Sequence, residues 1–166
     1  MKRFFKLIKP FSVANTILET GKVIDSYQSV KLIFIDVDNT ILSYKENEIS
    51  CRVKQWLDTM SVHKMIVIIT NNNKKRVEQI AGLNRFKCVC NAAKPFPFAY
   101  SNTLKKYNIL RKESIIIGDQ LFDDVLGGNL AGIKTILIKP IEKEMTYRMR
   151  VKRYFESILL KYMEII

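Results

Sequence analysis

Short apolar runs alternate with longer segments of helical character along most of this chain, and that alternation restricts the fold more than any other feature. The runs have the length and β-branched content of buried strands. Strands that alternate with helices predict a three-layer, Rossmann-like α/β fold with a mostly parallel sheet of about five strands. We expect the strands at residues 32–36, 65–70, 88–90, 114–118 and 135–138. We expect the helices from Ser50 to about Met60, through Val77 and Ile80 to Gly82, from Pro97 to about Tyr107, and over 122–131 before Gly132.

The length of 166 residues suits one domain that spans 1–166, with an N-terminal extension at 1–30 and a C-terminal basic amphipathic helix at 144–166. No apolar run reaches the roughly 18 residues that suggest a membrane-spanning helix. Lys6 and Lys9 interrupt any signal-peptide core near the N-terminus. The three cysteines form neither an even disulfide set nor a complete zinc set. We therefore expect a cytoplasmic protein.

The net charge of +12 is distributed unevenly along the chain. Residues 64–112 contain eleven lysines and arginines but a single acid, Glu78. Such a field raises the local concentration of anionic ligands. It suits a phosphorylated substrate, nucleic acid and an acidic membrane surface equally well, and a basic surface without a partner is the simplest alternative.

The C-terminal segment carries six apolar side chains on one helical stripe: Val151, Tyr154, Phe155, Ile158, Tyr162 and Ile165. We expect this stripe to dock on the domain. The alternative is a basic amphipathic helix that lies on anionic lipid, which would hold the protein at the inner face of a membrane.

Two carboxylates, Asp36 and Asp38, follow the first predicted strand. Strand alternation puts both side chains on one side of the chain, and ligands bind at the carboxyl ends of strands in open α/β sheets. Two acids this close repel each other, so they require a cation or divide two chemical roles between them. A polar turn that caps a helix is the simpler interpretation of Asp38, Asn39 and Thr40.

Other polar side chains follow the later strands. Thr70 and Asn71 end the second strand, where a hydroxyl and exposed amides can hold phosphate oxygens. Lys94 lies just after the third strand, and Asp119 ends the fourth, with two further aspartates in the next helix.

These side chains together fit phosphoryl transfer. Asp36, Asp38 and Asp119 supply an oxygen-rich site for Mg2+, while Thr70 and Lys94 bring a hydroxyl and a positive charge to the same rim. A carboxylate can act as the nucleophile and form an aspartyl-phosphate. The neighbouring acid can protonate the leaving oxygen and then activate water.

The same motifs resemble those of haloacid dehalogenase-like phosphatases. Residues 36–40, Thr70, Lys94 and residues 118–124 match the four motifs of that family in order. More narrowly, residues 70–77, Lys94-Pro95 and residues 118–129 look like the YqeG group of subclass IIIA, a similarity that covers roughly residues 1–155.

The resemblance implies a set of metal ligands and two catalytic carboxylates. It makes Asp36 the nucleophile and Asp38 the general acid and base. Asp36, Asp38 through its backbone carbonyl, and Asp119 would bind Mg2+. Thr40 and Asp124 would support the metal site from behind.

The resemblance also implies how phosphate is held. Thr70 and Asn71 would bind phosphate oxygens, and Lys94 would balance the charge of the phospho-aspartate. Position 123 is an aspartate where the group usually has threonine, so the supporting role stays open between Asp123 and Asp124.

The spacing between the motifs leaves no room for an inserted cap domain. One helix and one strand fill each of the intervals 41–69 and 71–93. An uncapped site is open to large substrates, and relatives of the YqeG group include phosphatases that act on phosphatidylglycerophosphate. We expect an Mg2+-dependent phosphomonoester hydrolase whose substrate is a phospholipid precursor or another large phosphorylated molecule.

Two other classes of protein fit part of the pattern. A basic nucleic-acid-binding protein, or a nucleic-acid phosphatase on the same fold, would explain the charge. The sequence has no recognised motif of interleaved aromatic residues, so we expect no stable nucleic-acid partner.

A phosphoacceptor signalling domain also uses clustered aspartates and a lysine, but the second acid, Asp38, would speed hydrolysis of the phospho-aspartate and destroy the signal.

Overall fold

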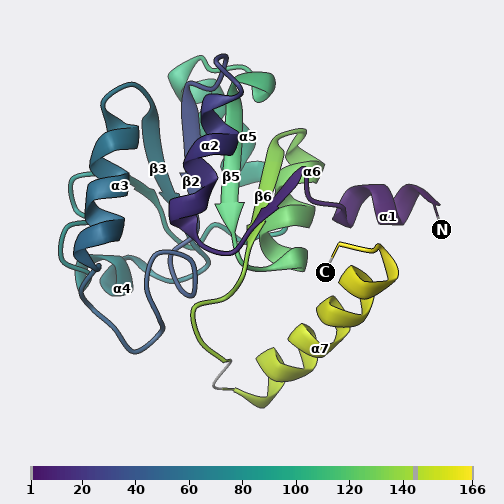
Figure 1. Ribbon diagram of the computed structural model, residues 1–166. Helices are drawn as coiled ribbons and strands as arrows, with labels where there is room; N and C mark the ends of the chain where they lie inside the picture. The colour runs from purple at the N-terminus through teal and green to yellow at the C-terminus, as the bar shows by residue number, and fades with distance from the viewer. Residues whose placement is uncertain (1, 144–145, 166) are drawn as a thin grey trace.

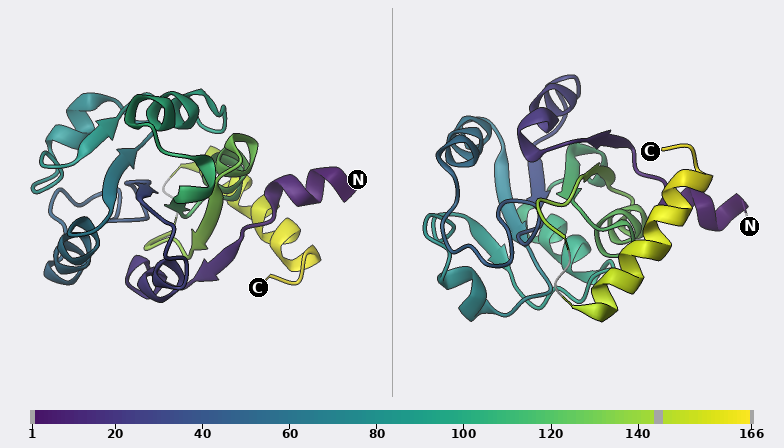
Figure 2. Two further views of the ribbon diagram at one scale, coloured as in Figure 1. Left: turned by 90° about the horizontal axis from the view of Figure 1, so that it is seen from above. Right: turned by 60° about the horizontal axis from the view of Figure 1, so that its bottom comes forward.

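The sheet of this protein has six strands, all parallel, in the order β1-β6-β5-β2-β3-β4. The computed structural model describes residues 2–143 and 146–165, without the side chains of residues 2–4. Helices cover both faces of the sheet (Figures 1 and 2), which confirms the three-layer α/β fold. The strands are β1 (Ser12–Ala14), β2 (Leu32–Ile35), β3 (Met65–Ile69), β4 (Lys87–Val89), β5 (Ser114–Gly118) and β6 (Lys134–Ile138).

The strand that the sequence did not reveal is β1, in the N-terminal segment. It runs parallel to β6, with Val13 opposite Leu137, and forms one edge of the sheet. Only three residues take part and their burial is partial, so the segment lacks the continuous apolar run that marks β2, β3, β5 and β6. The same segment contains α1 (Lys2–Ile8), a single 3-10 turn at Ile17–Glu19 and α2 (Thr20–Asp25).

Side-chain alternation along the strands divides the core between the two faces of the sheet. In β2, Ile33 and Ile35 join the cluster under α2, α3 (Cys51–Ser61) and α4 (Lys74–Glu78). Leu32 and Phe34 join the opposite cluster under α5 (Phe98–Tyr107) and α6 (Leu126–Ala131). All four side chains are buried, as expected for a central parallel strand that is covered on both faces.

The predicted helix boundaries are confirmed in most places. The Ser50 side chain accepts a hydrogen bond from the Val53 amide at the start of α3, and Gly132 ends α6 with a φ of 74°. Two helices differ from the prediction. The helix expected to reach Gly82 is only α4 and stops at Glu78, and the segment 122–131 begins with a π-helical turn at Leu121–Val125 before α6.

The C-terminal helix α7 (Tyr147–Tyr162) lies within the predicted range, of which residues 144, 145 and 166 fall outside the described residues. The predicted docking face is wrong, because Val151, Tyr154, Phe155, Ile158 and Tyr162 are all exposed. The helix packs through its other side, where Glu156 is buried and Leu159, Leu160 and Met163 contact the cluster formed by Ile8, Leu121, Val125 and Leu137. Amphipathic periodicity identified the helix, but ionic contacts with a distant loop decide which side faces inward.

The order of the strands sets the place of the functional site. The chain runs outward from β2 through β3 to β4 and then returns to β5 on the other side of β2. Ligands of open α/β sheets bind at such a switch point, outside the carboxyl ends of the strands. Figure 1 shows α7 below these strand ends, on the β6 side. Among the described residues, no helix is long and apolar enough to cross a membrane.

Candidate active site

Asp36 and Asp119 lie side by side at the switch point, because β2 and β5 are neighbours. The Asp36 amide donates to the Ile117 carbonyl at 3.0 Å, which extends the hydrogen bonding between β2 and β5 by one residue. Asp36 and Asp119 therefore follow directly after two paired strands. Both residues are buried. The structure thus brings together two acids that lie 83 positions apart in the sequence.

Lys94 reaches the same point from the loop after β4. Its Nζ lies 2.6 Å from Asp36 Oδ1 and 2.6 Å from Asp124 Oδ1, and its side chain is 3% exposed. The loop is fixed by Asn71, whose side chain accepts from the Lys94 amide at 2.7 Å and donates to the Lys94 carbonyl at 3.1 Å. Asn71 therefore positions Lys94, while its phosphate-binding role stays a prediction.

The two aspartates after β5 have different surroundings. Asp124 is buried between Lys94 and the Gln120 amide, which donates to its Oδ2 at 3.0 Å. Gly118 permits this arrangement, since a Cβ atom at that position would overlap the Asp124 carboxyl group. Asp123 is less buried and binds Lys152 of α7 at 2.6 Å. Only Asp124 thus lies beside the central lysine.

Three buried carboxylates form a candidate metal centre. Asp36, Asp119 and Asp124 each present one oxygen, and these oxygens lie within 4.8 Å of one another. The donor set is entirely oxygen, as Mg2+ prefers. Asp38 contributes no carboxylate oxygen to this group; the metal-binding role implied for its backbone carbonyl stays a prediction.

The side chain of Asp38 accepts hydrogen bonds from two residues that the sequence analysis did not pair with it. Asn72 donates to Asp38 Oδ2, and Arg76 donates to Asp38 Oδ1 from Nη2 at 3.0 Å and from Nε at 3.3 Å. Arg76 also donates to the carbonyls of Tyr44 and Glu46. This arginine therefore ties the loop after β2 to the carboxylate.

The two threonines of the motifs are buried and oriented by hydrogen bonds. The Thr70 hydroxyl accepts from the Asn72 amide at 3.1 Å. The Thr40 hydroxyl donates to Asp119 Oδ1 at 3.3 Å. Thr70 lines the same cavity as Asp36, Asp38 and Lys94, and Thr40 lies behind Asp119.

Burial and neighbouring charges shift the pKa values at this centre. Burial raises the pKa of Asp36 to about 7, although Lys94 acts in the opposite direction. Burial likewise raises the pKa of Asp119 well above its usual range, against the effect of Arg153. Burial opposes the charge of Lys94, but the carboxylates of Asp124 and Asp36 outweigh it and raise the pKa of Lys94. The centre therefore carries a charged ammonium group next to Asp36, and the pKa values of Asp36 and Asp119 are both raised by burial.

Helix α7 contributes charged side chains that sequence reasoning did not assign to the site. Arg153 pairs with the Asp119 carboxylate and also donates to the Asp119 carbonyl. Glu156 accepts from the Phe122 amide at 3.1 Å and from Arg153 at 3.0 Å. No sequence signal identified them, because the apolar stripe was the expected docking face and these charges lie off that stripe.

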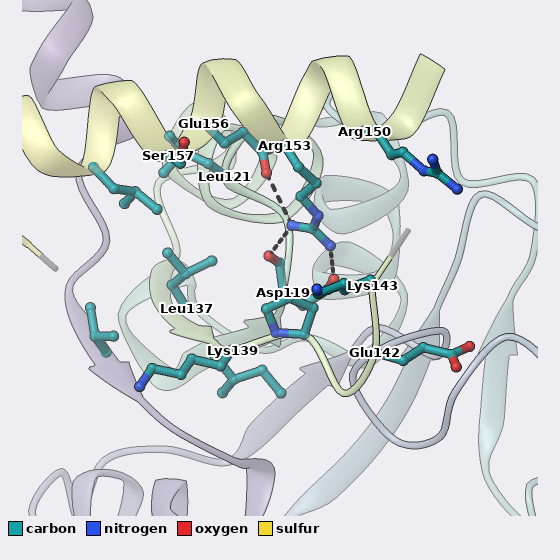
Figure 3. A pocket seen from close by; sticks show the side chains of 14 residues that line it. Asp119, Leu121, Leu137, Lys139, Glu142, Lys143, Arg150, Arg153, Glu156 and Ser157 are labelled. Atoms are coloured by element: carbon teal, nitrogen blue, oxygen red, sulfur yellow. Dashed lines mark hydrogen bonds and ion pairs between the residues drawn. The ribbon is translucent and has the colours of Figure 1, made fainter. Parts of the chain in front are cut away.

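Helix α7 contributes side chains to the walls of two separate cavities. The first, about 470 Å3, contains Asp36, Asp38, Thr70 and Lys94, and α7 adds Arg148, Met149 and Lys152 to its wall. The second, about 710 Å3, is lined by six apolar residues and by seven charged ones. The apolar residues are Val13, Leu121, Leu137, Ile138, Pro140 and Leu160, and the charged residues are Asp119, Lys139, Glu142, Lys143, Arg150, Arg153 and Glu156. Figure 3 shows Arg153 reaching from α7 to Asp119 in the second cavity. Asp119 lines the second cavity, while its neighbour Gln120 lines the first.

Comparisons with known proteins point to one family. A family model described as HAD-hydrolase-like matches residues 91–140. A Bacillus subtilis (strain 168) protein named "Probable phosphatase YqeG" is 31% identical over 134 residues, which cover 80% of this chain and 78% of that protein. Over a shorter stretch of 46 residues, 28% of this chain and 19% of the relative, a glyceraldehyde 3-phosphate phosphatase of Pyrococcus furiosus is 37% identical.

Solved structures agree on the fold. A haloacid dehalogenase-like hydrolase of Streptococcus pneumoniae superposes with a TM-score of 0.55 and 13% identity over 66% of this chain and 84% of its own. A 2-haloacid dehalogenase of Pseudomonas syringae does so with a TM-score of 0.51 and 21% identity over 69% and 54%. These similarities to phosphatases and other hydrolases do not favour the nucleic-acid-binding alternative.

Proposed function

The chain belongs to the haloacid dehalogenase-like (HAD) phosphatase family, and from that premise we propose that it is an Mg2+-dependent phosphomonoester hydrolase that works through an aspartyl-phosphate on Asp36. The observation that carries this proposal is the contact of one buried ammonium group, Lys94, with both Asp36 and Asp124. Asp119 lies within 4.8 Å of these acids. The preferred substrate is a phospholipid precursor such as phosphatidylglycerophosphate, or another large phosphorylated molecule.

We assign the two catalytic roles of the proposed reaction to Asp36 and Asp38. An Asp36 carboxylate oxygen attacks phosphorus, and the bond from phosphorus to the leaving oxygen breaks. Asp38 gives its proton to that leaving oxygen. In the second half, Asp38 takes a proton from water, the water oxygen attacks phosphorus, and inorganic phosphate leaves Asp36. The Lys94 ammonium, 2.6 Å from Asp36, offsets the negative charge that gathers there.

The carboxylates supply a suitable place for Mg2+. The three acids Asp36, Asp119 and Asp124 contact two cations, Lys94 and Arg153, and a divalent cation would relieve the repulsion that remains between them. When bound, the ion supplies charge neutralisation for the transferred phosphoryl group. The Thr40 hydroxyl keeps one oxygen of Asp119 in a fixed orientation.

The surroundings of the site support an amphiphilic substrate. Lys152 and Arg148 line the ionic cavity and suit a phosphorylated head group. The cavity beside Asp119, about 710 Å3, has apolar side chains such as Leu121, Leu137 and Leu160 that suit an acyl chain, together with charged side chains that suit a polar head group. No cap domain is inserted within residues 39–93, where α3, β3, α4 and β4 account for the regular structure, so a large substrate can approach.

The test is hydrolysis of an aryl phosphate by the Asp36→Asn variant. We expect turnover to fall to background while the melting temperature stays within a few degrees of the parent protein. A matched Asp25→Asn variant, changed at an exposed acid of α2, should keep full activity. Full activity in Asp36→Asn would refute the assignment of Asp36 as the nucleophile. Once activity is established, phosphate release from lipid phosphates and from soluble sugar phosphates of equal concentration tests the substrate class.

A further inference from the structure

Helix α7 turns its aromatic side outward. We call the exposed side chains Tyr147, Val151, Tyr154, Phe155, Ile158 and Tyr162 the outer face of α7. Their exposed fractions include 80% for Tyr147, 65% for Tyr154, 55% for Phe155 and 71% for Tyr162. These positions follow one another at helical spacing along the whole of α7. The outer face is therefore a continuous apolar surface.

The inner side of the same helix is charged. Arg153 and Lys152 make ion pairs with Asp119 and Asp123 after β5, and Glu156 accepts a hydrogen bond from the Phe122 amide of the same segment. A surface helix normally buries its apolar side chains, but α7 buries Leu159, Leu160 and Met163 only in part and leaves the six side chains of the outer face exposed. Large exposed apolar surfaces with polar rims mark interaction sites, so the outer face is expected to have a partner.

The charges around the outer face indicate an anionic partner. Within residues 146–165 the two acids are Glu156, which is buried, and Glu164, which is exposed just after the end of α7. Arg148 and Lys161 are exposed on α7 itself. At the far end, Phe5 of α1 stacks on Tyr162 with ring centroids 5.0 Å apart, which brings the exposed Lys6 and Lys9 beside the outer face. Apolar side chains are thus bordered by cations at both ends of α7.

We propose that the outer face of α7 docks on an anionic membrane surface. Tyrosines and other aromatic residues suit the interface between head groups and acyl chains, and the bordering cations suit anionic head groups. With 16 residues, α7 is about 24 Å long and lies in the plane of the surface. Because Arg148, Met149 and Lys152 of α7 line the ionic cavity, docking brings that cavity close to the lipid head groups.

A second copy of this chain fits the outer face less well. Two copies would bring two cation-rich faces together, and the whole chain carries a net charge of +12. One helix face of about 24 Å by 10 Å is also small beside the roughly 800 Å2 that each partner buries in a stable interface. The membrane assignment does not depend on the phosphatase chemistry, because the outer face contains no residue of the active site.

The experiment is co-sedimentation of the purified full chain with vesicles of phosphatidylcholine alone or mixed with phosphatidylserine. We expect binding to the mixed vesicles, weaker binding at higher ionic strength and little binding to phosphatidylcholine alone. The triple variant Tyr154→Ser/Phe155→Ser/Ile158→Ser should lower the partition coefficient by more than about tenfold. The matched Val62→Ser/Leu110→Ser variant removes exposed apolar side chains from elsewhere and should bind like the parent protein.

Several outcomes would overturn the proposal: no binding of the parent protein to the mixed vesicles, equal binding of the triple variant, or a dimer in solution that the triple variant abolishes. Unchanged circular dichroism and melting temperature establish that the triple variant is folded. The inactive Asp36→Asn variant should bind vesicles as the parent protein does, so loss of phosphatase activity and loss of docking are separate results. The Lys9→Gln/Lys161→Gln variant should lose binding to the anionic vesicles severalfold.

Discussion

Arg153, on the last helix, pairs with the carboxylate of Asp119 at the end of β5 and also donates to its backbone carbonyl. This relationship ties α7 directly to the candidate metal centre. Asp119 is fully buried at its side chain, and Arg153 is 18% exposed. Helix α7 lies outside the family motifs, but its Arg153 places a positive charge beside Asp119, which belongs to the last motif.

Arg153→Met should lower the free energy of unfolding of the metal-free protein by about 2–4 kcal/mol, because it leaves a buried carboxylate without its cation. Urea denaturation followed by circular dichroism measures the change. Arg52→Met, at an exposed arginine of α3, is the control and should change stability by less than about 0.5 kcal/mol. Equal effects of the two substitutions would show that the pair is energetically unimportant.

Lys94→Met should be more damaging, since two buried carboxylates would then face each other without the ammonium group. We expect a loss of about 3–5 kcal/mol of unfolding free energy together with loss of hydrolysis. Adding Asp124→Asn to Lys94→Met removes one of the two charges and should restore part of the stability but none of the activity. A double-mutant cycle on urea midpoints checks this, and purely additive effects would contradict it.

The stability of the metal-free protein should depend on pH through Asp36. Its pKa is about 7 in the folded protein, against 3.8 for an unperturbed aspartate, so the folded state holds this proton more tightly than the unfolded chain does. The corresponding stability is present at low pH and is lost as pH rises from about 4 to about 7. Thermal melts across that range should show a shallower decline in Asp36→Asn than in the parent protein. Identical pH profiles would contradict the shift.

Mg2+ should raise the melting temperature of the parent protein, because it binds the folded carboxylate cluster and not the unfolded chain. The stabilisation reaches about 2.7 kcal/mol when the free ion is at 100 times its dissociation constant. Asp124→Asn should weaken this response, while the neighbouring change Asp123→Asn should leave most of it, since only Asp124 belongs to the cluster. Calorimetric titration with Mg2+ compares the affinities of the two variants without any turnover. A larger loss of Mg2+ binding in Asp123→Asn than in Asp124→Asn would refute the assignment of Asp124 to the metal centre.

Much of the fold could be predicted from the sequence. The buried strands appear as apolar runs because both of their faces are covered, and the helices between them begin and end at capping and turn residues such as Ser50 and Gly132. Parallel strands also end at one edge of a sheet, so the sequence alone indicated that Asp36, Thr70, Lys94 and Asp119 share a rim. The edge strand β1 could not be found in this way, since its three residues gain their pairing only from β6.

Only the tertiary structure decided how the charges are shared. Asp123 and Asp124 are adjacent and chemically identical in the sequence, but the missing side chain of Gly118 lets Asp124 alone approach Lys94. In the same way, the sequence determined that α7 is an amphipathic helix, because its periodicity is local. Which side of α7 faces the domain depends on ion pairs with Asp119 and Asp123, about 30 positions earlier, and contacts over such distances exist only once the chain has folded.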